Sequence, residues 1–195
     1  MTHHPTNIDE YFEGIFKLSH VITAQDNKGE IFSLNNAAKL AINLIRSASY
    51  SDGKIIFIGN GGSAAIASHM AVDFSKNGDM PAICFNDGAF LTCLANDLGY
   101  EQVFSQSISM FAKPNDILIA ISSSGQSENI INGVKVAGSI PMNVITLSGF
   151  DERNPLKRMG DINFHVPYSR YGMVEISHLT LCHALLDLIL GEKAM

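Results

Sequence analysis

The chain has 195 residues, of which 46% are hydrophobic, and its formal net charge is −6. This composition argues against a disordered chain, and the scattered basic residues disfavour a nucleic-acid partner, because phosphate backbones require clustered Lys and Arg. The unpaired cysteines, the polar start and the lack of about 18 uninterrupted apolar residues predict a cytoplasmic globular protein with no membrane span.

The first 50 residues are expected to form an N-terminal helical extension. Residues 6–24 and 30–48 each carry apolar positions at helical spacing. Thr6 or Asn7 could cap the first helix, since acidic residues follow in its opening turn. Both helices precede the part of the chain that is expected to form a sheet.

From residue 54 onward, short apolar runs alternate with helix-length amphipathic segments. The runs predict strands at 54–59, 82–85, 116–122, 143–148 and 162–167. The segments predict helices at 63–74, 100–112, 127–138 and 171–192. Nearly continuous hydrophobicity is typical of parallel strands that are covered on both faces. We therefore expect one α/β domain, 1–195, whose core at 54–190 is a doubly wound sheet of five parallel strands.

A glycine loop, residues 59–63, follows the first predicted strand and opens a helix. Glycine lets the backbone approach a ligand closely, and the free N–H groups of a helix start attract an anion. The tract also fits G-x-G-x-x-A, with Asp87 after the second strand, so a dinucleotide site is an alternative. A glycine turn that binds nothing is the other alternative.

A serine loop, residues 122–127, follows the third predicted strand and again opens a helix. Its hydroxyls and the N–H groups of the helix start are neutral donors suited to a phosphate monoester, although serines also crowd ordinary turns. In a flavodoxin-like strand order, the carboxyl ends of the first and third strands flank the ligand-binding switch point. The pairing of the two loops favours a phosphate bound across both of them over a dinucleotide.

His69 and Asp73 lie one helical turn apart, on the helix that the glycine loop opens. Such a pair is a common half-site for zinc or another divalent metal, and the alternative is a hydrogen-bonded histidine beside a surface acid. The last helix adds Glu175, His178 and His183. Glu175 and His183 are separated by about 12 Å of helical rise, so spacing leaves the ligand set open. His178 is expected to be a satisfied core histidine.

Four segments together resemble one known family. They are "GNGGSAAIASHMAVDF", "FLTCLANDLGYEQVFSQ", "ISSSGQSENII" and "VEISHLTLCHALLDLI", and they are similar to the sugar isomerase (SIS) fold, in particular to the sedoheptulose 7-phosphate isomerases, or phosphoheptose isomerases. The resemblance covers about residues 54–190. It implies a three-layer αβα sandwich of flavodoxin-like order, a homotetramer with active sites at subunit interfaces, and bound Zn²⁺.

The resemblance also implies roles for individual residues. Substrate-binding roles fall on Asn60, Gly61, Gly62, Ser63, Asn96, Asp97, Ser122, Ser123, Ser124, Ser127 and Glu175. Metal-binding roles fall on His69, Asp73, Glu175 and His183, and catalytic roles fall on Asp73 and His183. Asp73 stands where the family has a glutamate, and Glu175 where it commonly has a glutamine. The segment 75–81 is shorter than in the family and lacks its arginine, so that Lys76 is the basic residue available there.

The function expected from the resemblance is ketose–aldose isomerisation of a phosphorylated sugar. The reaction would convert sedoheptulose 7-phosphate to D-glycero-D-manno-heptose 7-phosphate through an enediol, for lipopolysaccharide or capsule heptose synthesis. The alternative is a noncatalytic SIS protein that binds a phosphosugar or a partner and regulates or scaffolds. Some such relatives lack the histidine of the last helix, and the presence of His69 and His183 favours the enzyme.

Overall fold

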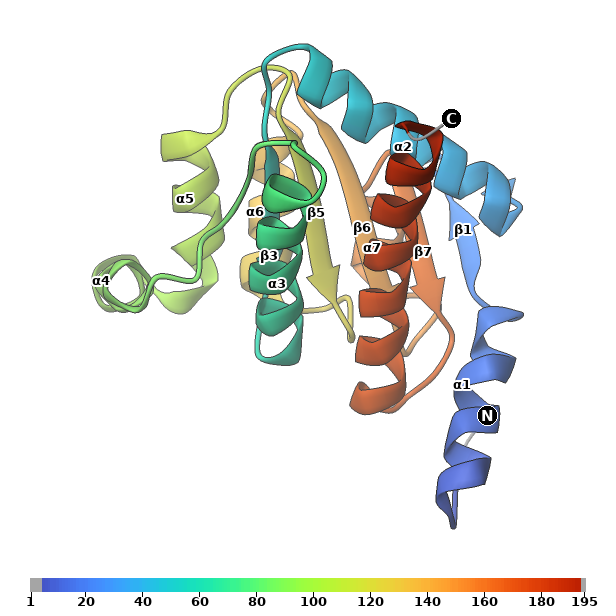
Figure 1. The fold of residues 1–195 in the computed structure, drawn as a ribbon. Coiled ribbons are helices and arrows are strands. Elements are labelled where there is room, and N and C mark those ends of the chain that lie inside the picture. Colours follow the sequence, from blue (N-terminus) through green and yellow to red (C-terminus); the bar gives the residue numbers. More distant parts are fainter. Residues whose placement is uncertain (1–4, 194–195) are drawn as a thin grey trace.

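The protein forms a doubly wound α/β sandwich around a central sheet (Figure 1), as seen in a computed structural model that describes residues 5–193. All five predicted strands are present, and they pair in parallel with one another. They are β3 (Ile55–Gly59), β4 (Ala82–Cys84), β5 (Ile117–Ser122), β6 (Asn143–Gly149) and β7 (Ile162–Val166). Their order is β4-β3-β5-β6-β7, so the direction of winding reverses between β3 and β5, as the flavodoxin-like order requires.

The sheet has seven strands among the described residues, not the five that were predicted. The additional strands are β1 (Thr23–Gln25) and β2 (Ile31–Phe32), and β1 extends the sheet antiparallel to β7. The sequence ranges predicted as helices overlapped both strands. The turn between them explains the difference, because the Asp26 carboxylate accepts hydrogen bonds from the backbone N–H groups of Lys28 and Glu30. This local turn brings two very short strands together where the apolar spacing indicated helix.

Helices cover both faces of the sheet, which confirms the three-layer arrangement. One layer holds α2 (Leu34–Tyr50), α3 (Gly62–Lys76) and α7 (Tyr171–Lys193), and the other holds α4 (Gly88–Leu98), α5 (Val103–Phe111) and α6 (Glu128–Ala137). Successive side chains of a strand point to opposite faces of the sheet, and strand β3 contributes to both layers in this way. Ile55 and Phe57 face the first layer, and Ile56 and Ile58 face the second.

Two short 3₁₀ helices, η1 (Tyr100–Gln102) and η2 (Pro155–Arg158), complete the elements together with α1 (Ile8–Ser19). Asn7 caps α1, because its side chain accepts from the N–H of Glu10. Helix α4 lies in a stretch to which no element was assigned from the sequence. It is capped by Asp87, whose carboxylate accepts from the N–H of Phe90 at 2.8 Å. The capping of α4 therefore accounts for Asp87 without a bound dinucleotide.

The last helix, α7, is long and rich in apolar residues. Residues 171–192 have the length and mean hydropathy (1.5) of a helix that could cross a membrane, and 44% of that stretch is buried within the protein. Cys182, Leu185, Leu186 and Ile189 pack into the core beside α2 and α3. A single apolar helix of this kind is also what the core of a large α/β sandwich requires, because it must cover the sheet.

Candidate active site

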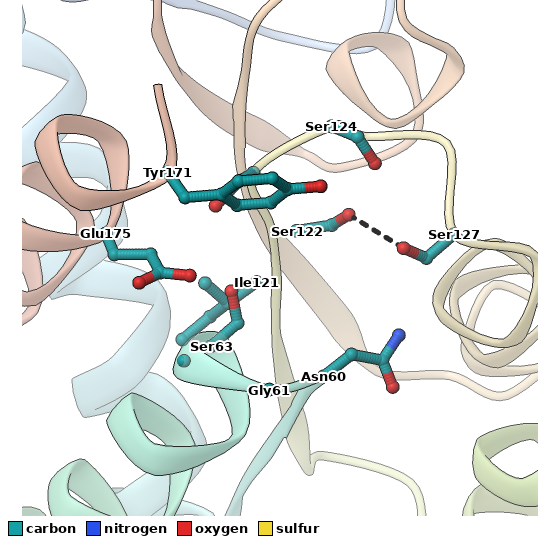
Figure 2. Close-up of a pocket in the computed structure, with 11 residues that line it drawn as sticks. Asn60, Gly61, Ser63, Ile121, Ser122, Ser124, Ser127, Tyr171 and Glu175 are labelled. Carbon is teal, nitrogen blue, oxygen red and sulfur yellow. Dashed lines mark hydrogen bonds between the residues drawn. The ribbon is translucent and has the colours of Figure 1, made fainter. Parts of the chain in front are cut away.

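The glycine loop and the serine loop meet at the carboxyl edge of the sheet. Gly59, the last residue of β3, pairs with Ile121 of β5, so both loops leave the sheet side by side at the switch point. They enclose a pocket of about 320 Å³, shown in Figure 2. The pocket is lined by Asn60, Gly61, Gly62, Ser63, Ile121, Ser122, Ser123, Ser124, Ser127, Tyr171 and Glu175.

The serine loop presents hydroxyl groups to this pocket. The Ser122 hydroxyl lies 3.4 Å from that of Ser127 and accepts from the N–H of Gly125 at 3.2 Å. Ser127 is the N-cap of α6, yet its side chain makes no capping hydrogen bond. The buried Ser123 hydroxyl has no hydrogen-bond partner within residues 5–193. The loop therefore retains hydroxyl and N–H donors that a phosphate could use.

The glycine loop presents the start of α3 to the same pocket. Gly61 is the N-cap of this helix, has φ of 53° and supplies no side-chain cap. A positive φ is a backbone conformation that glycine adopts without strain. Because no side chain caps the helix, its first N–H groups are left available for an anion.

Helix α7 closes the pocket with Tyr171 and Glu175 (Figure 2). Glu175 was predicted from the resemblance, and Tyr171 was not. Tyr171 packs edge-on against Phe150, with ring centroids 5.0 Å apart. The signal that could have located Tyr171 is its position as the first residue of the helix after the last strand, since helices begin at the carboxyl edge of a parallel sheet.

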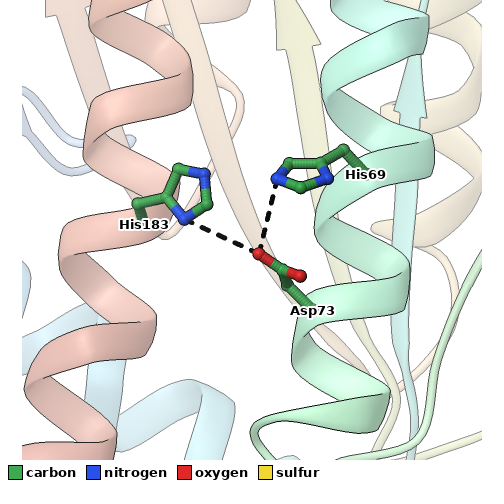
Figure 3. A group of neighbouring side chains, drawn as sticks. All are labelled: His69, Asp73 and His183. Atoms are coloured by element: carbon green, nitrogen blue, oxygen red, sulfur yellow. Dashed lines mark ion pairs between the residues drawn. The ribbon is translucent and has the colours of Figure 1, made fainter.

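A second group of candidate residues lies further along α3 and α7. His69 and Asp73 project from α3 toward His183 of α7 (Figure 3). Asp73 Oδ2 lies 3.4 Å from His69 Nε2 and 3.7 Å from His183 Nδ1. The two imidazole rings are 5.2 Å apart between centroids. We call these three residues the His/Asp triad.

The donor set of the His/Asp triad fits a divalent metal. One atom from each residue can be chosen so that all lie within 4.8 Å of one another. Two imidazoles and one carboxylate are a common set at catalytic zinc sites, which keep a further position open. The His69 side chain is 52% exposed and that of His183 is 38% exposed, so a ligand could reach the triad from solvent.

The structure does not bring all four predicted metal ligands together. Glu175 lies beside Gly62, at the pocket, and is not part of the His/Asp triad. The cause is the spacing on α7, since eight residues separate Glu175 from His183 and correspond to about 12 Å of rise. Helices α3 and α7 lie side by side (Figure 1), and we call the contact between them the seam. Within one chain, the pocket lies at the N-terminal ends of these helices, and the His/Asp triad lies further along the seam.

Asn96 and Asp97 lie apart from the pocket, in the last turn of α4. Both side chains are exposed, and Asn96 Nδ2 donates to Asp97 Oδ1 at 2.8 Å. Among residues 5–193, neither of them lines the pocket.

His178 lies in the core, as the sequence indicated, but it is only half satisfied, because its buried Nδ1 has no hydrogen-bond partner within residues 5–193. It is fully buried, and its Nε2 lies 3.0 Å from the carbonyl oxygen of Ser148, so this nitrogen carries the proton and donates. Burial lowers the pKa of His178 to about 4. His165 of β7 is also fully buried, with a pKa lowered to about 4 by burial and by the positive charge of Lys157. Neither histidine lines the pocket.

Comparisons with known proteins place this geometry in a family. A model of the SIS domain matches residues 11–149. The phosphoheptose isomerase of Pectobacterium atrosepticum is 35% identical over 170 residues, which cover 84% of this chain and 86% of that protein. The phosphoheptose isomerase of Histophilus somni is 32% identical over 185 residues, which cover 90% of this chain and 94% of that protein.

A solved structure gives the same result at the level of the fold. The phosphoheptose isomerase of Neisseria gonorrhoeae matches with a TM-score of 0.81 and 31% identity, over 93% of this chain and 96% of the other. The chain therefore belongs to the SIS domain family, in the phosphoheptose isomerase branch of the sugar-phosphate isomerases.

Proposed function

We propose that the protein is a ketose–aldose isomerase that converts sedoheptulose 7-phosphate to D-glycero-D-manno-heptose 7-phosphate. The observation that carries this proposal is the seam between α3 and α7, which has a donor-lined pocket at one level and the His/Asp triad at the next. Relatives that bear the name phosphoheptose isomerase and cover most of the chain support the choice of a seven-carbon sugar phosphate.

The phosphate end of the substrate is assigned to the pocket. Ser122, Ser124 and Ser127 offer hydroxyl groups, and the starts of α3 and α6 offer backbone N–H groups. These donors are uncharged, and they gain strength when their acceptor is an ionised phosphate. The Glu175 carboxylate lines the same pocket and is assigned to the sugar hydroxyls, because an anionic group would repel the phosphate.

The carbonyl end of the substrate is assigned to the His/Asp triad. Asp73 removes the proton from the carbon next to the carbonyl, and His183 protonates the carbonyl oxygen, which gives an enediol. Asp73 then returns its proton to the former carbonyl carbon, and His183 takes the proton of the hydroxyl on the neighbouring carbon, which gives the aldose. General acid–base steps of this kind each contribute about 10²–10⁴-fold to the rate.

A divalent cation such as Zn²⁺ would be held by His69, Asp73 and His183, and when bound it would polarise the carbonyl. The nitrogens that face Asp73 Oδ2, His69 Nε2 at 3.4 Å and His183 Nδ1 at 3.7 Å, are the ones that would bind the cation. A role of Glu175 as a further metal ligand remains a prediction from the family, as does substrate binding by Asn96 and Asp97.

We propose further that the protein works as a homo-oligomer, with a tetramer as the expected form, and in the cytoplasm. The reason for an assembly is the apolar surface of the N-terminal region, where Ile8, Phe12 and Phe16 of α1 are all more than half exposed. A second chain would also offer a route by which Asn96 and Asp97 could approach a substrate.

The separation of the pocket from the His/Asp triad within one chain favours a second candidate function. A noncatalytic SIS protein would use only the pocket, to bind a phosphosugar and regulate or scaffold. Such a protein would bind sedoheptulose 7-phosphate equally well after chelation or in the variant His183→Ala.

The test is incubation of the purified protein with sedoheptulose 7-phosphate and Zn²⁺, with aldose formation followed by NMR. We expect turnover in the unmodified protein and in His20→Ala, which changes an exposed histidine at the end of α1. Turnover should be lost in Asp73→Asn and His183→Ala. If the unmodified protein forms no aldose with metal present, the proposed reaction is wrong.

A further inference from the structure

The amide of Asn60 forms a reciprocal pair with the amide of Asn129. Asn60 Nδ2 donates to Asn129 Oδ1 at 2.8 Å, and Asn129 Nδ2 donates to Asn60 Oδ1 at 2.9 Å. Asn60 belongs to the glycine loop, and Asn129 lies in the first turn of α6, directly after the serine loop. The pair therefore ties together the two loops that line the pocket.

The orientation of both amides follows from one backbone group. Asn129 Oδ1 also accepts from the N–H of Ile130 at 2.9 Å. A backbone N–H can only donate, so this atom of Asn129 must be the oxygen. The other amide atom of Asn129 is therefore the nitrogen, which donates to Asn60. The Asn60 atom that accepts this hydrogen bond must be the oxygen.

Tyr100 completes the hydrogen bonding of Asn60. The phenolic hydroxyl of Tyr100, on η1, donates to Asn60 Oδ1 at 2.9 Å. With Asn129 Nδ2 as its other donor, the Asn60 oxygen has both lone pairs occupied. The Asn60 nitrogen donates one of its N–H groups to Asn129, and the other has no acceptor among residues 5–193. In Figure 2 this nitrogen is on the side of Asn60 that faces Ser127.

We infer that Asn129 and Tyr100 are positioning residues, which fix Asn60 in the pocket as a donor and prevent it from acting as an acceptor. The inference deepens the proposed function, on which it rests for the identity of the ligand. The free N–H of Asn60 is matched to an acceptor, and the acceptor assigned to this pocket is a phosphate oxygen. An asparagine without these partners could rotate its amide by 180° and place its oxygen against the phosphate. The amide oxygen and the phosphate oxygens are all acceptors and would repel one another.

The burial of Asn129 supports this role. Asn129 is only 3% exposed, and a polar side chain in such a place costs free energy unless it is hydrogen-bonded. Its hydrogen bonds to Asn60 meet that need, so both side chains are held before a ligand arrives. Donors that are held in advance bind a ligand without the loss of side-chain freedom on binding.

The experiment is a double-mutant cycle that measures the affinity for inorganic phosphate by calorimetry. Asn60→Ala and Asn129→Ala should each weaken phosphate binding about 10-fold, the loss expected for one hydrogen bond to a charged group. The double variant should be no weaker than Asn60→Ala alone, because Asn129 acts only through Asn60. Additive losses, or an Asn129→Ala protein that binds phosphate as the unmodified protein does, would overturn the inference.

Two further variants provide a second test and a control. Tyr100→Phe changes a side chain that is 54% exposed, so folding is preserved, and it should weaken phosphate binding about 3-fold. Asn43→Ala is the control, since Asn43 is exposed on α2 and does not line the pocket. It should bind phosphate normally. If Tyr100→Phe also binds normally, Tyr100 does not act as proposed.

Phosphate affinity separates this inference from the proposed reaction. A protein that binds phosphate in the expected pattern but forms no aldose would refute the reaction and retain the positioning role. If turnover is found, Asn129→Ala should raise KM for sedoheptulose 7-phosphate with little change in kcat, as expected for a group that binds substrate and transition state alike. If the unmodified protein does not bind phosphate, the donor role of Asn60 is wrong.

Discussion

Glu175 of α7 packs its carboxylate directly against Gly62, the first residue of α3. A Cβ atom added at residue 62 would overlap the carboxyl carbon and both carboxylate oxygens of Glu175. The absence of a side chain at residue 62 is thus what admits the carboxylate to the edge of the pocket. This contact joins the glycine loop to the helix that carries His183.

The variant Gly62→Ala should displace Glu175 without harming the fold. Gly62 does not have a positive φ, so alanine fits the backbone there and lowers the entropy of the unfolded chain. The overlapping atoms are the mobile end of a side chain. We expect an unchanged or slightly higher melting temperature together with an isomerase activity reduced about 10-fold, if Glu175 binds the sugar hydroxyls through hydrogen bonds.

Gly61→Ala is the contrasting control for this variant. Gly61 has φ of 53° and no atom within 4 Å of an added Cβ, so alanine there strains the backbone but displaces nothing. It should lower the free energy of unfolding by about 1–3 kcal/mol, because its ψ of −120° lies outside the left-handed helical region that other residues can reach. A Gly62→Ala protein that keeps full activity would show that the position of Glu175 does not matter for turnover.

Removal of one ligand from the His/Asp triad should abolish metal binding. His183→Ala leaves only the pair on α3, which is too few for a stable site, and dialysis against a weak chelator should then remove Zn²⁺ completely. The unmodified protein and His20→Ala should each retain metal in elemental analysis after the same dialysis. Equal retention by His183→Ala would exclude the His/Asp triad as the metal site.

The sheet could be predicted from the sequence because its strands are buried on both faces. Ile55 to Ile58 are all at most 1% exposed, and such a run is apolar at every position. The hairpin of β1 and β2 could not be predicted in this way. Ile31 and Phe32 form a strand of two residues, which is too short to show any periodicity, and the turn at Asp26 determines their pairing.

The candidate site was predictable where loops follow strands, and not where side chains meet across the fold. Ser122 ends one buried strand and Gly61 lies two residues after another, so topology alone brings them together. Asn60 and Asn129 are 69 residues apart in the sequence, and no pattern in either segment indicates that their amides pair. The position of Glu175 on the last helix could be predicted. How far along α3 that helix packs, and thus which residue Glu175 would contact, could not.

The stability of the protein should fall as the pH is lowered from about 6.5 to about 4. His165 and His178 take up a proton near pH 6.5 when unfolded, but burial lowers their pKa to about 4 in the folded protein. Between these values the unfolded state binds more protons, so acid favours unfolding. Each unit of pKa difference corresponds to about 1.4 kcal/mol. Urea unfolding at pH 7 and pH 5 measures the effect.

His178→Gln identifies the contribution of one of these histidines. The glutamine amide can still donate to the Ser148 carbonyl, which accepts from His178 Nε2 at 3.0 Å, but it does not titrate. The loss of stability between pH 7 and pH 5 should therefore be smaller in this variant than in the unmodified protein. An identical loss would mean that His178 takes up its proton at the same pH in both states.

The exposed apolar face of α1 should hold the oligomer together. Ile8, Phe12 and Phe16 are 65%, 63% and 69% exposed, and an apolar groove of about 350 Å³ lies beside them between α1, α2 and α7. Burial of one phenylalanine side chain contributes about 1.5–3 kcal/mol, so Phe12→Lys should shift the protein toward smaller species. Glu152→Lys, in the exposed loop before η2, should not. Sedimentation velocity at micromolar concentration measures both, and a stable monomer of the unmodified protein would refute the proposed assembly.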